Sequence, residues 1–248
     1  GRIFRNQSYR ALWKIKDIKM TNTVFPAQPT PLVDIAGRDE KFPVNRIYCV
    51  GLNYVDHVLE FGEDPSKVDP VYFMKPGDAV VADGVDVPYP QHTNNFHYEI
   101  ELVVAIGKEA YNISEDQAED HIFGYAVGND LTRRDMQLEL KAKGMPWDPS
   151  KGFDMSAPIS AIHPAADIGH PKEGRIWLSV NGDVKQDGNI NQLIASVKKV
   201  VSQLSELYVL KPGDLIYSGT PSGIGPVVKG DVMEAGIDGI DTLTTKIV

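Results

Sequence analysis

Two glutamates stand one residue apart in the segment NNFHYEIELVVAIGK, residues 94–108. Side chains alternate along a strand, so Glu99 and Glu101 are expected on the same face, roughly 7 Å apart. The apolar run LVVAI predicts that this strand is buried, and two like charges on a buried face are costly unless something neutralises them. A bound cation would neutralise both, so the spacing points to a metal site.

Asp130 is the best candidate for a third ligand. It ends the apolar segment GYAVGND and immediately precedes a helix expected from Thr132. Three carboxylates without a nearby cysteine form an all-oxygen donor set, which suits Mg²⁺, Mn²⁺ or Ca²⁺ better than zinc. A strand edge with solvated glutamates would give the same spacing, so both interpretations stay open at this point.

Two further polar pairs have helical spacing. His57 and Glu60 lie three residues apart in NYVDHVLEFG, where a helical turn would give an imidazole base oriented by a carboxylate. Arg134 and Gln137 have the same spacing, and their helix face could offer a guanidinium and an amide to an anionic ligand. Such pairs are also common on solvated surfaces, so neither pair identifies a site by itself.

The strands and helices expected around these residues indicate a β-rich α+β fold. Strands are expected at RIYCVG, VYFMKP, EIELVVAIG and IFGYAVGND, and RIWLSV-NG-DVKQDG predicts a hairpin with Asn181-Gly182 at its turn. Helices are expected at SEDQAED behind a Ser114 capping box, at TRRDMQLELKAK from Thr132 to Gly144, and at NQLIASVKKVVSQLSEL.

Composition narrows the classes of function. The chain has 248 residues and a net charge of −9, which argues against a nucleic-acid partner because phosphate binding requires a basic face. No stretch approaches 18 apolar residues, so no membrane partner is expected. The single Cys49 excludes an internal disulfide and fits a reducing compartment, which predicts a cytoplasmic location.

Residues 1–45 are expected to form an N-terminal extension and a proline-rich, extended arm. Residues 1–19 are basic, with Asp17 as their one acidic residue, and Met20 resembles a natural start. Residues 1–19 are therefore interpreted as an extension that does not belong to the native fold.

Six ordered motifs together resemble the fumarylacetoacetate hydrolase family. They are GLNYVDHVLE, FMKP, NNFHYEIEL, GYAVGNDLTRRDMQ, KGMPWDPSKGFD and LKPGDLIYSGTPSGIGP. The similarity is closest to smaller bacterial acylpyruvase-like and fumarylpyruvate hydrolase members. It implies a mixed β-sandwich roll with a few peripheral helices, a catalytic domain over residues 46–248, a homodimer, and a bound Mg²⁺ or Mn²⁺.

The resemblance also implies roles for individual residues. The metal ligands are Glu99, Glu101 and Asp130; the catalytic residues are His57, Glu60 and Lys151; the substrate-binding residues are Arg134, Gln137 and Thr220. One departure is Leu52, where relatives often have arginine in G-R-N-Y, so any contact made by that arginine is absent here.

The implied reaction is hydrolysis of a carbon–carbon bond in a small anionic 2-oxo acid, an acylpyruvate such as fumarylpyruvate. His57, polarised by Glu60, would activate water, and Lys151 would stabilise the oxyanion. Two alternatives use the same site: oxaloacetate decarboxylation, and isomerisation or decarboxylation of 2-hydroxyhepta-2,4-diene-1,7-dioate. A third alternative is a non-catalytic protein that binds a metal or a small acid.

Overall fold

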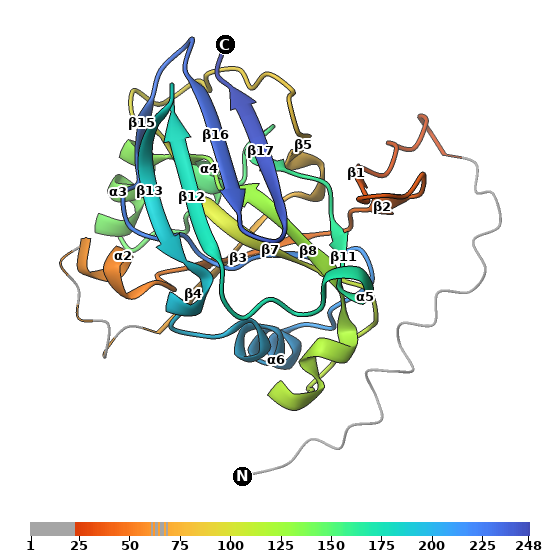
Figure 1. Cartoon of the computed structure of the whole chain (residues 1–248). Coiled ribbons are helices and arrows are strands. Elements are labelled where there is room, and N and C mark those ends of the chain that lie inside the picture. The colour runs from red at the N-terminus through yellow and green to blue at the C-terminus, as the bar shows by residue number, and fades with distance from the viewer. Residues whose placement is uncertain (1–22, 61, 63, 65–66, 68) are drawn as a thin grey trace.

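The computed structural model describes residues 23–60, 62, 64, 67 and 69–248. Two sheets face each other in the body of the protein, and the helices lie around their edges (Figure 1). The predicted β-rich roll is confirmed. The basic leader over residues 1–19 lies outside the described residues. None of the described helices is long and apolar enough to cross a membrane.

The larger sheet has eight strands and mixed pairing. Its order is β4 (Val71–Lys75), β3 (Ile47–Gly51), β14 (Leu215–Tyr217), β7 (Ile100–Ile106), β8 (Ile122–Asn129), β10 (Ala157–Ile159) and β5 (Val80–Ala82), with β11 (His163–Pro164) paired to β8.

The second sheet is antiparallel and has four strands, and two smaller sheets complete the described β structure. The four strands run in the order β13 (Asp183–Asn189), β12 (Arg175–Val180), β16 (Val232–Ile237) and β17 (Asp241–Lys246). The smaller sheets are β15 (Gly225–Val227), β6 (Phe96–Tyr98) and β9 (Thr132–Arg133), and β1 (Leu32–Asp34) with β2 (Lys41–Pro43).

The helices are short. The α-helices are α2 (Val55–Glu60), α3 (Arg134–Ala142), α4 (Asp148–Lys151), α5 (Ala165–Ile168) and α6 (Val197–Leu207). The 3₁₀ helices are η1 (Gly77–Ala79), η2 (Glu115–His121) and η3 (Ile190–Gln192).

Strand β7 is buried on both faces, which explains its continuous apolar run. Ile100 and Leu102 belong to the large core cluster. Residues of the four-stranded sheet, such as Ile176, belong to the same cluster. Val103, on the opposite face, belongs to a second cluster. Because side chains alternate, Glu101 shares the face of Val103. The carboxylates therefore lie on the side of the large sheet that faces away from the main core.

The hairpin between β12 and β13 is confirmed, with φ of 53° at Asn181 and 86° at Gly182. The Ser114 capping box is also present, but the helix that it opens is a 3₁₀ helix.

Two helix starts predicted from the sequence are wrong. The helix expected from Thr132 begins at Arg134, because Thr132 pairs with His97 in the β6–β9 ladder. The helix expected from residue 191 begins at Val197, after an N-cap at Ser196. Residues 193–195 form a bridge and a bend instead of a helix, because Asn53 holds their backbone, accepting a hydrogen bond from Ala195 N at 2.7 Å.

Residues 23–45 contain bends, a turn and a small hairpin, β1–β2. Val33 and Phe42 are buried in the second core cluster, so this segment packs against the large sheet. The domain boundary at residue 46 remains a prediction.

The buried carboxylate of Asp214 joins the segments that enter the parallel strands β3 and β14. It accepts hydrogen bonds from Arg46 Nη2 at 2.6 Å, from Asn45 Nδ2 at 2.7 Å and from the Lys211 backbone amide at 2.8 Å. One side chain therefore fixes both strand entries.

Replacing Asp214 by alanine is expected to lower the free energy of unfolding by about 3 kcal/mol, because three donors lose their acceptor. Urea denaturation provides the measurement. Asp34→Ala is a matched control, since Asp34 pairs with Lys41 at 2.6 Å on the exposed surface and its loss is expected to change little. Equal midpoints for the two variants would contradict this account of Asp214.

Candidate active site

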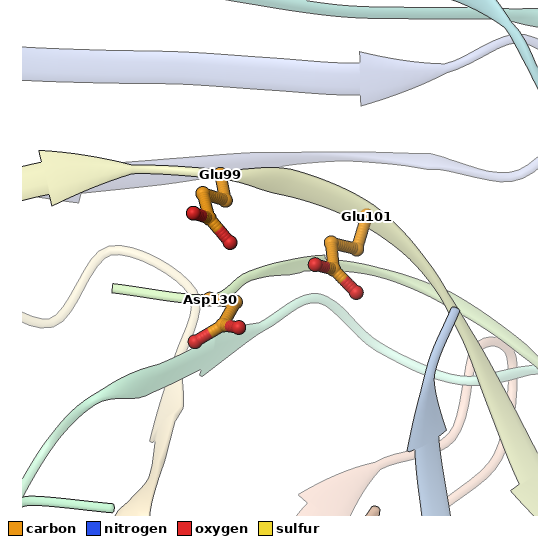
Figure 2. Close-up of side chains that lie close together, drawn as sticks. All are labelled: Glu99, Glu101 and Asp130. Carbon is orange, nitrogen blue, oxygen red and sulfur yellow. The ribbon is translucent and has the colours of Figure 1, made fainter. Parts of the chain in front are cut away.

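Three carboxylate side chains converge beside β7 and β8. Glu99 lies between β6 and β7, Glu101 is in β7, and Asp130 directly follows β8. One ligand oxygen from each lies within 4.8 Å of those of the other two, and all three residues are buried. Figure 2 shows the three carboxylates turned toward one another. The structure thus brings together the three residues that the sequence singled out.

The backbone between the two strands fixes this arrangement. The amide of Asp130 donates to the Glu99 carbonyl at 2.8 Å, and the Glu99 amide donates to Asn129 Oδ1 at 2.9 Å. A Cβ at Gly128 would lie 2.4 Å from Val103 Cγ2, so a glycine is required for β8 to pack here. The close approach of β8 carries Asp130 to the glutamates.

Lys151, at the end of α4, is bound to two of the carboxylates. Its Nζ donates to Glu99 Oε2 at 2.7 Å, to Asp130 Oδ2 at 2.8 Å and to Thr132 Oγ1 at 2.7 Å. Burial alone would lower the pKa of Lys151, but Asp130 and Glu99 raise it above its ordinary value. Lys151 is therefore a permanent cation, and these contacts use all three of its donors.

Arg134 and Gln137, on the first turn of α3, lie on the other side of Glu99. Arg134 Nη2 donates to Glu99 Oε1, and Arg134 Nη1 donates to Gln137 Oε1. Burial would raise the pKa of Glu99, but Lys151 and Arg134 lower it well below its usual range. The spacing of Arg134 and Gln137 therefore marks a buried face of α3.

Lys75, at the end of β4, is a residue of the site that sequence reasoning missed. It is 1% exposed, and its Nζ lies 2.8 Å from Asp130 Oδ1. The Lys75–Asp130 contact is an ion pair and not a hydrogen bond. Lys75 Nζ instead donates hydrogen bonds to the carbonyls of Leu131, at 3.1 Å, and Lys151. The sequence signal for Lys75 is the motif FMKP, in which a lysine ends an apolar strand.

Glu101 has the least compensated charge of the three carboxylates. Its Oε2 accepts a hydrogen bond from the Gly219 amide at 2.7 Å. Burial, followed by the charges of Asp130 and Glu99, raises the pKa of Glu101 well above its usual range. A divalent cation would remove the repulsion between these groups, and the all-oxygen donor set suits a hard metal ion. The residues present therefore fit a divalent metal.

The short helix α2 carries the predicted His57–Glu60 pair. His57 Nδ1 lies 3.0 Å from Glu60 Oε2, and Glu60 Oε1 accepts from the Gly223 amide at 3.2 Å. Burial would raise the pKa of Glu60, but the hydrogen bonds from His57 and Gly223 lower it. Glu60 is thus an ionised acceptor that orients the imidazole and links α2 to the loop after β14.

Thr220 follows Gly219 in that loop and is held by a second residue that sequence reasoning missed. Buried Gln186 of β13 donates to Thr220 Oγ1 and to the Pro221 carbonyl, both at 2.8 Å. Gln186 also accepts from the Ile100 amide at 2.9 Å. Because Thr220 Oγ1 accepts from Gln186, its own hydroxyl proton is available to another acceptor.

A cavity of about 30 Å³ lies beside this group. Its lining residues are Gly51, Leu52, His57, Phe73, Glu99, Arg134, Gln137, Leu138, Lys141, Trp147 and Lys151. This lining does not include Glu60, Glu101, Asp130 or Thr220. A larger cavity of about 310 Å³, beside Tyr125 and α6, is lined by none of the three carboxylates, whereas Glu99 lines the smaller one.

The chain is similar to proteins of one known family. The profile described as "Fumarylacetoacetate (FAA) hydrolase C-terminal" matches residues 46–248. The chain belongs to the fumarylacetoacetate hydrolase family.

Two relatives and one crystal structure show which proteins of known name this chain is similar to. A fumarylpyruvate hydrolase of Ralstonia sp is 44% identical over 74% of this chain and 95% of its own. The mitochondrial oxaloacetate tautomerase of Homo sapiens is 41% identical over 81% of this chain and 90% of its own. The crystal structure of fumarylpyruvate hydrolase from Pseudomonas aeruginosa, in complex with Mn²⁺ and pyruvate, is 47% identical and superposes with a TM-score of 0.90, covering 92% of this chain and 99% of that one.

Replacing Lys75 by methionine tests its role at Asp130. In the presence of a chelator, the free energy of unfolding is expected to fall by about 3 kcal/mol, because a buried carboxylate loses one of its cations. Added Mn²⁺ is expected to recover part of this loss, because it supplies positive charge at Asp130. Urea denaturation with EDTA and with Mn²⁺ measures both effects.

Lys41→Met is the control for this experiment, since Lys41 makes an exposed lysine–aspartate pair with Asp34. It is expected to change stability little under either condition. The role of Lys75 at Asp130 would be contradicted if Lys75→Met had the wild-type urea midpoint in EDTA. It would also be contradicted if the loss of stability in this variant grew when Mn²⁺ was added.

Proposed function

We propose that the protein is a metal-dependent hydrolase that cleaves a carbon–carbon bond of an acylpyruvate such as fumarylpyruvate, giving pyruvate and a carboxylic acid. The observation that carries the proposal is the convergence of three buried carboxylates with Lys151, beside a cavity that Glu99, Lys151 and His57 line. The similar Pseudomonas aeruginosa structure, which holds Mn²⁺ and pyruvate, supports it.

Glu99, Glu101 and Asp130 would hold the metal, which we propose is Mg²⁺ or Mn²⁺, with Ca²⁺ as a substitute. A bound divalent cation supplies Lewis-acid polarisation of the 2-oxo acid and positive charge to balance the enolate that cleavage releases.

His57 is the proposed general base. Glu60 holds its Nδ1, so Nε2 is the basic nitrogen and takes the proton of a water whose oxygen attacks the 4-carbonyl carbon. The bond between C3 and C4 then breaks, and its electron pair goes to C3. The proton on His57 is delivered to C3 to give pyruvate, while the acyl carbon keeps the hydroxyl of the water as a carboxylic acid, which loses its proton to the solvent.

Lys151 and Gln137 are the proposed stabilisers of the oxyanion at C4. Because Lys151 uses all three donors on Glu99, Asp130 and Thr132, it must release one of these contacts to reach the oxyanion. Arg134 and Thr220 are the proposed partners of the polar ends of the substrate, and Gln186 directs the Thr220 hydroxyl by donating to its oxygen.

The similarity to a mitochondrial oxaloacetate decarboxylase of Dictyostelium discoideum, 40% identical over 79% of this chain and 90% of its own, favours a second candidate, decarboxylation of oxaloacetate at the same site. Decarboxylation needs no activated water, so it should tolerate the loss of His57. A homodimer and a cytoplasmic location remain predictions, and size-exclusion chromatography with light scattering tests the first.

The proposed activity requires the metal. With fumarylpyruvate, maleylpyruvate, acetylpyruvate and oxaloacetate as candidate substrates, turnover of an acylpyruvate is expected to disappear in EDTA and to return with Mg²⁺ or Mn²⁺. Pyruvate release measures it. Full turnover in EDTA would remove the metal from the mechanism, and turnover of oxaloacetate alone would favour the second candidate.

His57→Asn is expected to lower kcat for acylpyruvate hydrolysis by about 10²- to 10⁴-fold, because the general base is lost. Divalent metal binding, measured by calorimetry, is expected to persist in this variant, since His57 is not a proposed ligand. His121→Asn, outside the cavity lining, is the control. An unchanged kcat in His57→Asn would contradict the assignment of the base.

A further inference from the structure

The larger cavity, of about 310 Å³, has no part in the proposed reaction. Apolar side chains from β7, β8, η3 and α6 line it, and Leu102, Tyr125 and Ile190 among them are buried. Lys172 and Asn191, which also line it, are exposed, so the cavity opens to solvent. Clefts of roughly 300–1,000 Å³ hold small organic ligands in proteins. The cavity therefore has room for a small ligand with an apolar body.

A buried hydrogen-bonded pair lies in the wall of this cavity. The hydroxyl of Tyr125 is 2.7 Å from His170 Nδ1, and the two rings meet edge to face with their centroids 5.8 Å apart. Burial, followed by the charge of Glu119, raises the pKa of Tyr125 above its ordinary value, so the phenol keeps its proton.

The Tyr125–His170 pair keeps one donor for a ligand in either tautomer of the imidazole. If the phenol donates to Nδ1, the ring proton is on Nε2. If Nδ1 carries the proton and donates to the phenol oxygen, the phenolic proton is left over. Within the part of the chain that the structure describes, neither His170 Nε2 nor a second acceptor for Tyr125 has a recorded partner.

The charges around the cavity favour an anion. Its charged lining residues are Lys172, Lys198 and Glu119, which give one net positive charge on a chain whose net charge is −9. Lys198 Nζ lies 3.3 Å from Glu119 Oε1. Lys172, two residues after His170, makes no hydrogen bond or ion pair with any residue that the structure describes.

We propose that this cavity is a second ligand site, which binds an amphipathic monocarboxylate. The apolar chain of the ligand lies on the buried lining, and its carboxylate accepts from Lys172 and from the spare donor of the Tyr125–His170 pair. A single carboxylate matches the single net positive charge, and an apolar chain matches the buried walls. The proposal does not depend on the proposed hydrolase activity.

The second site is separate from the carboxylate cluster. Leu102 lines the larger cavity, whereas the preceding residue Glu101 belongs to the cluster. Because side chains alternate along β7, the two sites lie on opposite faces of the large sheet. Binding at the second site therefore requires no metal ion.

Calorimetric titration of the full chain with octanoate in EDTA tests the proposal. A Kd below about 1 mM is expected, because burial of the chain adds to the charge interaction. Octylammonium, which has the same chain and the opposite charge, is expected to bind at least about ten-fold more weakly. Acetate, which lacks the chain, is expected to show a Kd well above about 1 mM.

Two variants locate the site. Lys172→Glu is expected to raise the Kd for octanoate about ten-fold, because it reverses the charge at the rim. Val197→Trp, at the start of α6, is expected to abolish binding, because the indole fills the cavity. Lys229→Glu makes the same charge reversal at an exposed lysine outside the lining and is the matched control, with a wild-type Kd. Circular dichroism verifies that each variant is folded.

Four results would overturn the proposal. The first is a Kd for octanoate above about 1 mM in the wild-type protein. The second is octylammonium binding as tight as that of octanoate. The third is octanoate binding that requires Mn²⁺, which would place the carboxylate at the metal site. The fourth is a Kd within about two-fold of wild type in Lys172→Glu, which remains decisive if Val197→Trp does not fold.

Discussion

Like charges held close together inside a protein repel each other strongly, and the candidate site is built around that repulsion. Three carboxylates meet within 4.8 Å in a buried region. Lys75, Lys151 and Arg134 compensate Glu99 and Asp130, whereas Glu101 keeps a strongly raised pKa. Such an arrangement is costly for stability alone. This cost is explained if the same carboxylate oxygens bind a divalent cation and the surrounding cationic side chains bind an anionic substrate.

The fold supplies this arrangement from distant parts of the chain. Strands β7 and β8 deliver the carboxylates, the end of β4 delivers Lys75, and the helices after β9 deliver Arg134 and Lys151. The four-stranded sheet closes the main core on the opposite face of β7 and contributes Gln186, which holds the loop carrying Thr220. The sheets thus hold the three carboxylates, while the short helix α2 holds the proposed base. This division is common in enzymes, where a rigid scaffold positions groups on shorter connecting segments.

The sequence predicted those parts of the site whose signals are local. Strand alternation pointed to Glu99 and Glu101, a strand end pointed to Asp130, and helical spacing pointed to His57 with Glu60. Lys75 and Gln186 escaped notice because their partners are distant, with Lys75 bonded to Leu131 56 positions away and Gln186 to Thr220 34 positions away. The starts of α3 and α6 were misplaced for the same reason: a strand pairing at Thr132 and the hydrogen bonds between Asn53 and the backbone of Ala195 override local helix signals. The six motifs indicated the family. The increase in exposure along α3, from 3% at Arg134 to 46% at Leu138, appears only in three dimensions.

The account depends on one divalent ion bound by Glu99, Glu101 and Asp130. Anomalous diffraction from a crystal of the protein grown with Mn²⁺ tests this most directly, because manganese can be located without reference to the protein coordinates. The account predicts a single strong peak in contact with a carboxylate oxygen of each of these three residues. A fully occupied Mn²⁺ elsewhere, or no peak between them while Lys151 still bridges Glu99 and Asp130, would contradict it.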